Sequence, residues 1–184
     1  MKAWLASVLT VTLAGGGSYA QEAPSSPLEA TLKSSDGEQA PLSKWRGKPV
    51  ILFYEDKDST TLNLGLKQEL FERGKQRGLL DAASVVAVAN LKPFNFFPAR
   101  QIALSYVRDE EKKAGVPILV DLEGTLGGAP WGLPTKTSTV MLLDASGAVV
   151  YRHSGRMDEA EKAVFFGALS QLIGLDLSTQ EPQP

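Results

Sequence analysis

The stretch KPVILFYEDKDSTT, residues 48–61, decides the fold. Its first half, the near-continuous apolar run at 48–54, is typical of a central strand that is buried on both faces. An acidic loop follows the run, and leucines then recur at every fourth position from Leu62 to Leu70. That spacing predicts a helix over 59–76. The loop therefore lies at the carboxyl end of a buried strand, which is where α/β proteins bind their ligands.

The other apolar runs alternate between strand and helix patterns. Strands are predicted at 28–33, 84–90, 116–121, 138–144 and 148–153. The last two flank a short Ala-Ser-Gly turn and predict a hairpin. Helices are predicted from Pro98 to Gly115 and from Asp158 to Gly174, and Asp158 with Glu161 forms the pattern of a capping box. This order predicts an α/β domain with a mixed sheet that is covered on both faces.

The helix that follows Pro98 has an apolar face formed by Ile102, Ala103, Tyr106 and Val107. A face of this kind normally packs on the core of a globular domain. We therefore expect Tyr106, and also Trp45, to be core residues.

Composition excludes several classes of function. The chain has 184 residues, enough for one domain, with a net charge of −2 and no cysteine. The absence of cysteine excludes disulfides, thiol redox chemistry, thiolate metal sites and lipid attachment through a thiol. Because there is no basic stripe, we expect no nucleic-acid partner. We expect no metal and no cofactor.

The N-terminus has the pattern of a secretory signal. Lys2 precedes the apolar run 3–14, and small residues at positions 18 and 20 predict cleavage after Ala20. No other stretch is long and apolar enough to cross a membrane, so the mature chain is expected to be periplasmic or secreted rather than membrane-embedded. The predicted organisation is a signal at 1–20, a linker at 21–27, a domain at 28–174 and a flexible tail at 175–184.

Two quoted segments carry a resemblance to a known fold. LEATLKSSDGEQAPLSKWRGKPVILFY (28–54) and TVMLLDASGAVVYRHSG (139–155) resemble the opening and the closing hairpin of thioredoxin-like proteins near the TlpA and peroxiredoxin branch. ASVVAVANLKPFN (83–95) and PILVDLEGTLGGAPWGLPTKTSTVMLLD (117–144) are similar to the YtfJ-type family of exported bacterial proteins. The resemblance implies a three-layer α/β/α sandwich with a mixed central sheet, in the bacterial envelope.

The resemblance also implies where a redox site would lie. The two redox cysteines of that fold fall at Asp58 and Thr61, and the proline that faces them falls at Ser138 or Thr137. All these positions are replaced, which indicates a redox-inactive scaffold that binds an envelope protein or peptide. The candidate groove consists of Asp58, Thr61, Ser138, Phe94 and Trp131.

An aromatic cluster, Phe94, Phe96 and Phe97, follows the strand at 84–90. One interpretation, which we favour, is that these rings close the core under a long loop. The other is that they are exposed as an apolar rim for a peptide or protein partner, together with Trp131 in the Gly-Pro-rich loop 124–134.

The acidic loop permits two further interpretations. Asp56 and Asp58 match the D-x-D-x-T spacing of a Mg²⁺-dependent phosphohydrolase, in which one carboxylate attacks phosphorus and the other protonates the leaving group. Such a site needs a second acidic pair, for which Asp121 and Glu123 are the candidates. Alternatively, Glu55 joins Asp56 and Asp58 in a divalent-metal site.

The simplest interpretation is a solvated loop whose acids favour the dipole of the following helix. In that case Asp58 or Ser59 caps the helix. His153 is the only histidine, and no nucleophile elbow accompanies it, so we expect a structural or solvent-facing role.

Overall fold

The computed structural model describes residues 27–177. The predicted signal, nearly all of the predicted linker and positions 178–184 of the predicted tail lie outside the described residues. Among residues 27–177, no helix combines the length and the apolar character needed to cross a membrane.

A seven-stranded mixed sheet forms the centre of the fold, in the order β2-β1-β5-β4-β3-β6-β7. The strands are β1 Thr31–Lys33, β2 Gln39–Pro41, β3 Val50–Glu55, β4 Ser84–Asn90, β5 Ile118–Asp121, β6 Thr139–Leu143 and β7 Val149–Ser154. β3, β4 and β5 are parallel, whereas β6 runs antiparallel to both β3 and β7. All the predicted strands are present, and β2 is an additional one.

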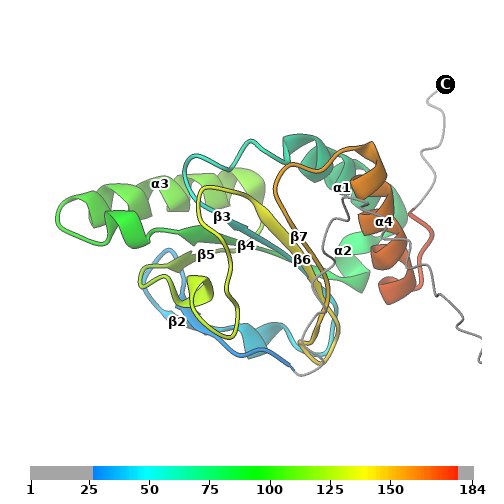
Figure 1. Cartoon of the computed structure of the whole chain (residues 1–184), viewed down its shortest axis with the longest axis horizontal. Coiled ribbons are helices and arrows are strands. Elements are labelled where there is room, and N and C mark those ends of the chain that lie inside the picture. Colours follow the sequence, from blue (N-terminus) through cyan, green and yellow to red (C-terminus); the bar gives the residue numbers. More distant parts are fainter. Residues whose placement is uncertain (1–26, 178–184) are drawn as a thin grey trace, which may run out of the picture.

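The helices are α1 Leu64–Arg77, α2 Leu79–Ala82, α3 Ala99–Ala114 and α4 Glu159–Ile173, with short 3-10 helices at Leu42–Trp45, Lys92–Phe94 and Thr125–Gly127. The register of the strands places α1, α3 and α4 on one face of the sheet. Phe53 pairs with Val140 and Ala87, and Ala87 pairs with Ile118, so these four side chains share a face. α1 and α4 pack around Phe53, and α3 packs around Ile118. Figure 1 shows the three helices along one side of the strands.

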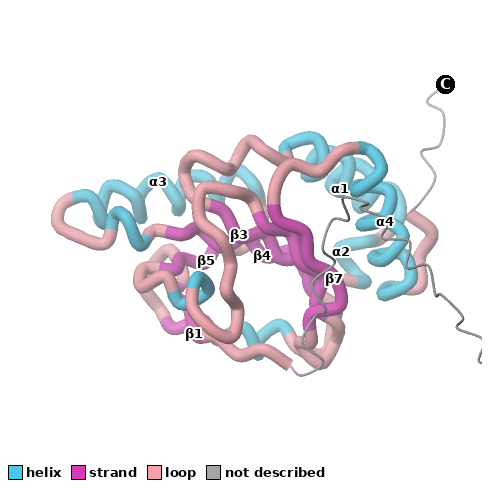
Figure 2. Tube along the Cα trace, viewed as in Figure 1, coloured by secondary structure: helices cyan, strands magenta, loops and turns pink. Residues whose placement is uncertain are grey.

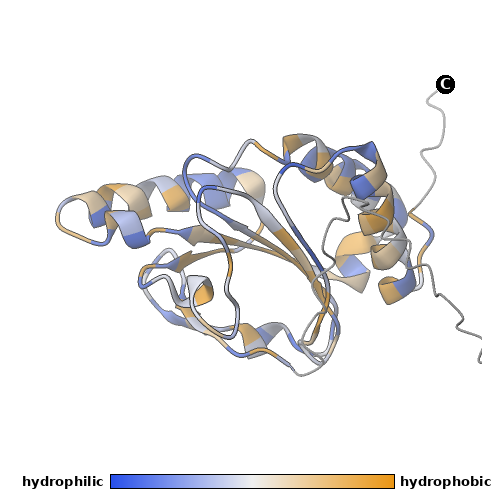
Figure 3. Cartoon of the chain, viewed as in Figure 1, coloured by the Kyte–Doolittle hydropathy of each residue, from blue (hydrophilic) through white to orange (hydrophobic). Residues whose placement is uncertain are grey.

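The opposite face of the sheet is covered mainly by strands and loops. Its side chains, which include Leu52 and Val88, pack against the β1–β2 hairpin, the first 3-10 helix and Trp131 from the loop between β5 and β6. Figure 2 shows this layer as loop with short strand and helix segments, and Figure 3 shows the apolar colour continuing along the strands between the two layers. The predicted α/β fold with a mixed sheet is confirmed. The difference is that the second covering layer contains no long helix within residues 27–177.

The N-terminal segment spans the width of this second layer. The backbone N–H of Leu28 donates to the carbonyl of Gly147, in the turn between β6 and β7, at 3.3 Å. A few residues later, β1 pairs with β5, which is separated from β6 by β4 and β3 in the strand order. The carbonyl of Glu29, between these points, accepts a hydrogen bond from Trp131 Nε1 at 3.1 Å.

The predicted start of the helix after β3 is wrong. Residues 56–62 form consecutive turns, in which Ser59 N donates to the Asp56 carbonyl at 3.1 Å and Leu62 N donates to the Ser59 carbonyl at 3.0 Å. α1 begins only at Leu64, and its N-cap is Asn63. Neither Asp58 nor Ser59 therefore caps the helix, because both lie in the turns that precede it.

The C-terminal helix begins as predicted. Asp158 and Glu161 form a complete capping box, and the helix ends at Gly174. The next residues do not behave as the predicted tail, because Leu177 is fully buried. Its N–H donates to Ser170 Oγ at 2.9 Å, and its carbonyl accepts from Arg73 Nη1 at 2.5 Å. The packed part of the chain thus extends to Leu177.

Candidate functional site

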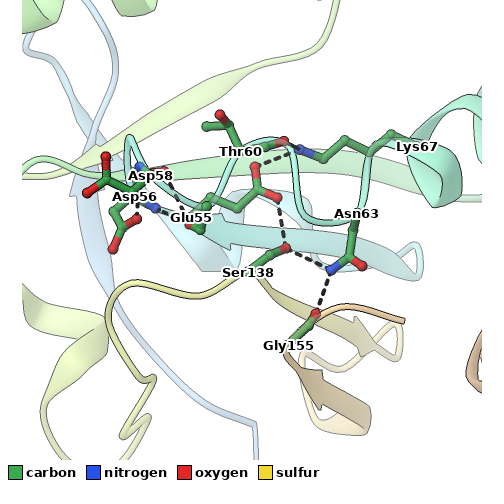
Figure 4. A network of polar contacts seen from close by, with 9 residues as sticks. Glu55, Asp56, Asp58, Thr60, Asn63, Lys67, Ser138 and Gly155 are labelled. Carbon is green, nitrogen blue, oxygen red and sulfur yellow. Dashed lines mark hydrogen bonds and ion pairs between the residues drawn. The ribbon is translucent and has the colours of Figure 1, made fainter. Parts of the chain in front are cut away.

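A buried carboxylate lies at the carboxyl end of β3. Glu55 is 8% exposed and is on the helix-covered face of the sheet. Lys67 Nζ, from α1, donates to its Oε2 at 2.6 Å, and Ser138 Oγ, just before β6, donates to its Oε1 at 2.8 Å. Figure 4 shows both contacts. The charge of Glu55 is therefore paired, and both of its oxygens accept hydrogen bonds, as burial of a carboxylate requires.

Asn63 extends this network to the C-terminal half of the chain. Its Nδ2 donates to Ser138 Oγ at 3.1 Å and to the Gly155 carbonyl at 2.8 Å. Its Oδ1 accepts from the backbone N–H of Met157 at 2.9 Å. One side chain thus joins the start of α1 to the segment before β6 and to the loop between β7 and α4 (Figure 4). The sequence analysis did not identify this role.

The carboxylate of Asp56 binds backbone groups. Its two oxygens accept the N–H of Lys136 and, at 3.2 Å, the N–H of Asp58. Lys136 has a positive φ of 58°, a conformation that non-glycine residues rarely adopt. Asp56 therefore holds the loop that precedes β6, and its carboxylate is already occupied.

The acids proposed as a second metal-binding pair are also engaged. Asp121 is 1% exposed and accepts the backbone N–H groups of Thr125 at 2.7 Å and Leu126 at 2.9 Å. Glu123 accepts from Asn95 Nδ2 at 3.0 Å. Within residues 27–177, no group of three or more His, Cys, Asp or Glu side chains is arranged to hold a metal ion.

Two of the five candidate groove residues lie together on the surface. Asp58 and Thr61 are exposed in the turns before α1. Ser138 lies beneath them in the fold's polar network and is fully buried, so it is not accessible to a partner. The cis peptide bonds of the described chain precede Pro98 and Pro130, so the peptide before Ser138 is trans.

Trp131 does not belong to this surface. It is 2% exposed and packs in the core on the opposite face of the sheet. Its burial excludes direct contact with a partner, so the candidate groove has to be redrawn without it. The fifth residue, Phe94, is half-buried and lines a groove that begins beside Glu55 and Asp56.

That groove has a volume of about 740 Å³ and runs between α3 and β4. The small side chains of Ala87 and Ala89 line it on the β4 side, and Ile102 and Tyr106 line it on the α3 side. Its other lining residues include Glu55, Asp56, Lys57, Thr60, Phe94 and Glu110. Asp58 and Thr61 are not among them.

Exposed side chains on α3 and in the segment before it correct two expectations. Tyr106 is 66% exposed and Ile102 is 68% exposed, so neither is a core residue. Phe96 and Phe97 are exposed as well, which contradicts the interpretation that the whole aromatic cluster closes the core. Trp45, by contrast, packs against the core as expected.

Two further polar side chains lie near the sheet. The hydroxyl of Tyr54 is buried and has no hydrogen-bond partner among the described residues; burial, with the nearby charges of Asp121 and Asp56, raises the pKa of Tyr54 well above its usual value. His153 is half-buried, and its Nδ1 lies 3.7 Å from Glu161 Oε1. Neither side chain lines the groove.

Comparison with solved structures identifies the fold. The chain superposes on a DsbF homologue from Corynebacterium diphtheriae with a TM-score of 0.60 at 16% identity, covering 90% of this chain and all of that one. It superposes on the exposed lipoprotein thioredoxin of Streptococcus pneumoniae with a TM-score of 0.57 at 22% identity, covering 79% and 100%. StoA from Bacillus subtilis gives 0.52 at 20% identity, covering 76% and 97%.

Sequence comparison agrees with this assignment. A chloroplastic peroxiredoxin Q from Populus jackii is 31% identical over 127 residues, which cover 64% of this chain and 57% of the relative. A second peroxiredoxin Q, from Gentiana triflora, is 30% identical over 127 residues. The chain thus spans a little over half the length of these curated relatives. No protein-family model matches the chain.

The solved structures define the fold: the chain has a thioredoxin-like fold. Its fold is similar to those of a DsbE, a DsbF homologue and StoA, and part of its sequence is similar to peroxiredoxin Q. It differs from a thiol enzyme in one respect that the sequence states directly, which is that the chain has no cysteine.

Proposed function

We propose that this chain is an exported thioredoxin-like protein of the YtfJ type that binds an envelope protein or peptide and carries out no thiol chemistry. The surface that binds the partner is the turn region at 56–62, where Asp58 and Thr61 are exposed. This redraws the predicted groove, from which Trp131 and Ser138 are removed by their burial.

One observation carries the proposal. The loop that follows β3 is held in place by a paired, buried network in which Glu55, Lys67, Asn63 and Ser138 use their polar atoms on each other and on the backbone. A surface that is ordered in this way before it meets a partner loses less conformational entropy on binding. The peroxidase chemistry in the names of the relatives needs a thiolate, which a chain without cysteine cannot supply.

Two observations support export. The first twenty residues have the pattern of a cleaved signal, and one of the similar solved structures is described as an exposed lipoprotein. Fractionation of cells that express the full chain, followed by mass measurement of the mature protein, tests this part. Recovery of the uncleaved chain in the cytoplasm would contradict it.

Site-specific photo-crosslinking tests the binding surface. A photoreactive residue at Thr61 is expected to give a discrete, saturable adduct with one envelope protein. The matched control is the same residue at Ala163, which is exposed on α4. Equal adducts from both positions, or none from Thr61 in a working system, would refute the assignment of this surface.

Asp58→Arg provides an independent test. The Asp58 side chain is exposed and makes no side-chain hydrogen bond or ion pair among the described residues. The substitution is therefore expected to leave the melting temperature unchanged while it abolishes capture of the partner. Unchanged capture would place the binding surface elsewhere.

The alternative is a Mg²⁺-dependent phosphohydrolase that uses Asp56 and Asp58. Its support is the position of the D-x-D spacing directly after a buried strand. It would require Asp56 to release the backbone N–H groups that it now accepts. Turnover of an aryl phosphate with Mg²⁺, lost in Asp58→Asn, would favour it, and the absence of turnover across several phosphate esters would remove it.

A further inference from the structure

α3 has a surface without a partner among the described residues. Ile102 and Tyr106 are four residues apart, so they lie on the same side of the helix, and both are about two-thirds exposed. They form one wall of the apolar groove, whose β4 wall contains the small residues Ala87 and Ala89. Protruding apolar side chains of α3 therefore lie beside a groove that could receive such side chains from another molecule.

We propose that this face is a homodimer interface, in which α3 of a second copy lies antiparallel to α3 and enters the groove. A twofold axis near residue 104 would bring Ile102 of one copy against Tyr106 of the other. Such an interface is isologous, which means that one patch must fit itself. The groove runs from Ala99 to Glu110 along α3, a length of about 16 Å at the rise of an α-helix.

Charge at the two ends of α3 fits the same arrangement. The N-cap of α3 is Pro98, which has no side-chain capping hydrogen bond, and no acidic residue lies in the first turn. The helix N-terminus thus keeps the partial positive charge of the helix dipole, although the N–H groups of Arg100 and Gln101 donate to the carbonyls of Phe96 and Pro98. At the other end Glu110, which accepts from Lys113 Nζ at 2.8 Å, lines the groove. An antiparallel pair would place Glu110 of each copy beside the N-terminus of the other, twice by symmetry.

Exposed apolar side chains on α3 and in the segment just before it supply about half of the area that a dimer needs. Phe96, Phe97, Ile102 and Tyr106 are 59%, 81%, 68% and 66% exposed. At roughly 150–200 Å² for each side chain, they offer on the order of 450 Å² of apolar surface per copy before the groove walls are counted. A stable interface buries about 800 Å² per partner. Asp58 and Thr61 lie outside the groove, but Asp56, Lys57 and Thr60 of the same turn region line one end of it, so the dimer interface adjoins the proposed partner surface.

Sedimentation equilibrium of the purified chain tests the proposal. We expect a dimer that dissociates on dilution. In Tyr106→Glu the dissociation constant of the dimer should rise about 100-fold or more, because a charge would be buried in the centre of an apolar interface. The matched control is Val164→Glu on α4, where a side chain of similar exposure, 62%, lies away from α3. Circular dichroism shows that each variant is folded.

A second experiment tests the geometry. Because the chain has no cysteine, a short bismaleimide can link only introduced thiols. Ser105→Cys, exposed and adjacent to the proposed axis, is expected to give a covalent dimer, whereas Ala163→Cys is not. A wild-type chain that remains monomeric at about 1 mM, or a dimer that survives Tyr106→Glu without cross-linking at 105, would overturn the proposal. Because Thr61 itself is not in the groove, a Thr61 adduct with another protein that persists in Tyr106→Glu separates failure of the dimer from failure of the partner surface.

Discussion

Removal of the small Asn63 side chain should cause a large loss of folding free energy. It is 3% exposed and makes three hydrogen bonds, with Ser138 Oγ, the Gly155 carbonyl and the Met157 N–H. At about 1 kcal/mol net for each bond, and somewhat more for the buried Met157 donor that is left unpaired, Asn63→Ala should lower the free energy of unfolding by about 3–4 kcal/mol. For a domain of this size that is a fall in melting temperature of roughly 6–16 °C.

Urea denaturation followed by circular dichroism measures the change. The control is Gln68→Ala, an exposed substitution on α1 that should stay within about 0.5 kcal/mol of wild type. Asn63→Asp separates the contributions, because it keeps the acceptor for Met157 and loses both donors. A loss below about 1 kcal/mol in Asn63→Ala, with an unchanged urea dependence, would refute the argument that this network holds the loop.

Three other perturbations follow from the contacts described above. Lys67→Met leaves the carboxylate of Glu55 buried without its cation and should destabilise the fold by about 2 kcal/mol. Adding Glu55→Gln to this variant should restore part of the lost stability. A double-mutant cycle measured by urea denaturation gives the coupling energy of the pair. Asp158→Ala removes the α4 cap and should cost about 1 kcal/mol, and an unchanged melting temperature would contradict it. Burial, with a smaller effect of the Glu161 carboxylate, raises the pKa of Tyr151 from 10.0 to about 12. The neutral phenol therefore stabilises the fold below pH 10, and this contribution to stability is lost as the pH rises to about 12. Tyr151→Phe should flatten the fall in stability across that window, with a residual slope from Tyr54, and an identical pH profile would show that Tyr151 is not the group responsible.

The elements that sequence analysis identified correctly are those defined by local pattern. β4 matches its predicted range, and the capping box of α4 is present, because apolar periodicity and capping chemistry act over a few residues. β2 was missed because it has only three residues, Gln39–Pro41, and its pairing with β1 defines it. The start of α1 was misplaced because turns with helix-like composition precede it.

The candidate site was less predictable, since its contacts join distant parts of the chain. Ser138 and Glu55 are 83 positions apart, and nothing in either segment signals their hydrogen bond. The sequence places Trp131 near the site because its loop lies at the correct edge of the sheet, but packing decides which face of the sheet its ring covers. The apolar periodicity of α3 correctly predicted a helix, yet periodicity does not state what covers an apolar face, and Tyr106 is exposed.

The path of the N-terminal segment has a consequence for how the chain folds. Glu29 and Trp131, which are hydrogen-bonded, are 102 positions apart, and Leu28 reaches still further to Gly147. Contacts of such long sequence separation slow folding, because the loop between them must close before they form. One layer of the domain therefore cannot be completed until most of the polypeptide is present. On the export route proposed above, a translocation pore would therefore meet a chain whose second layer is still incomplete, and this layer would form only after nearly all of the chain has crossed.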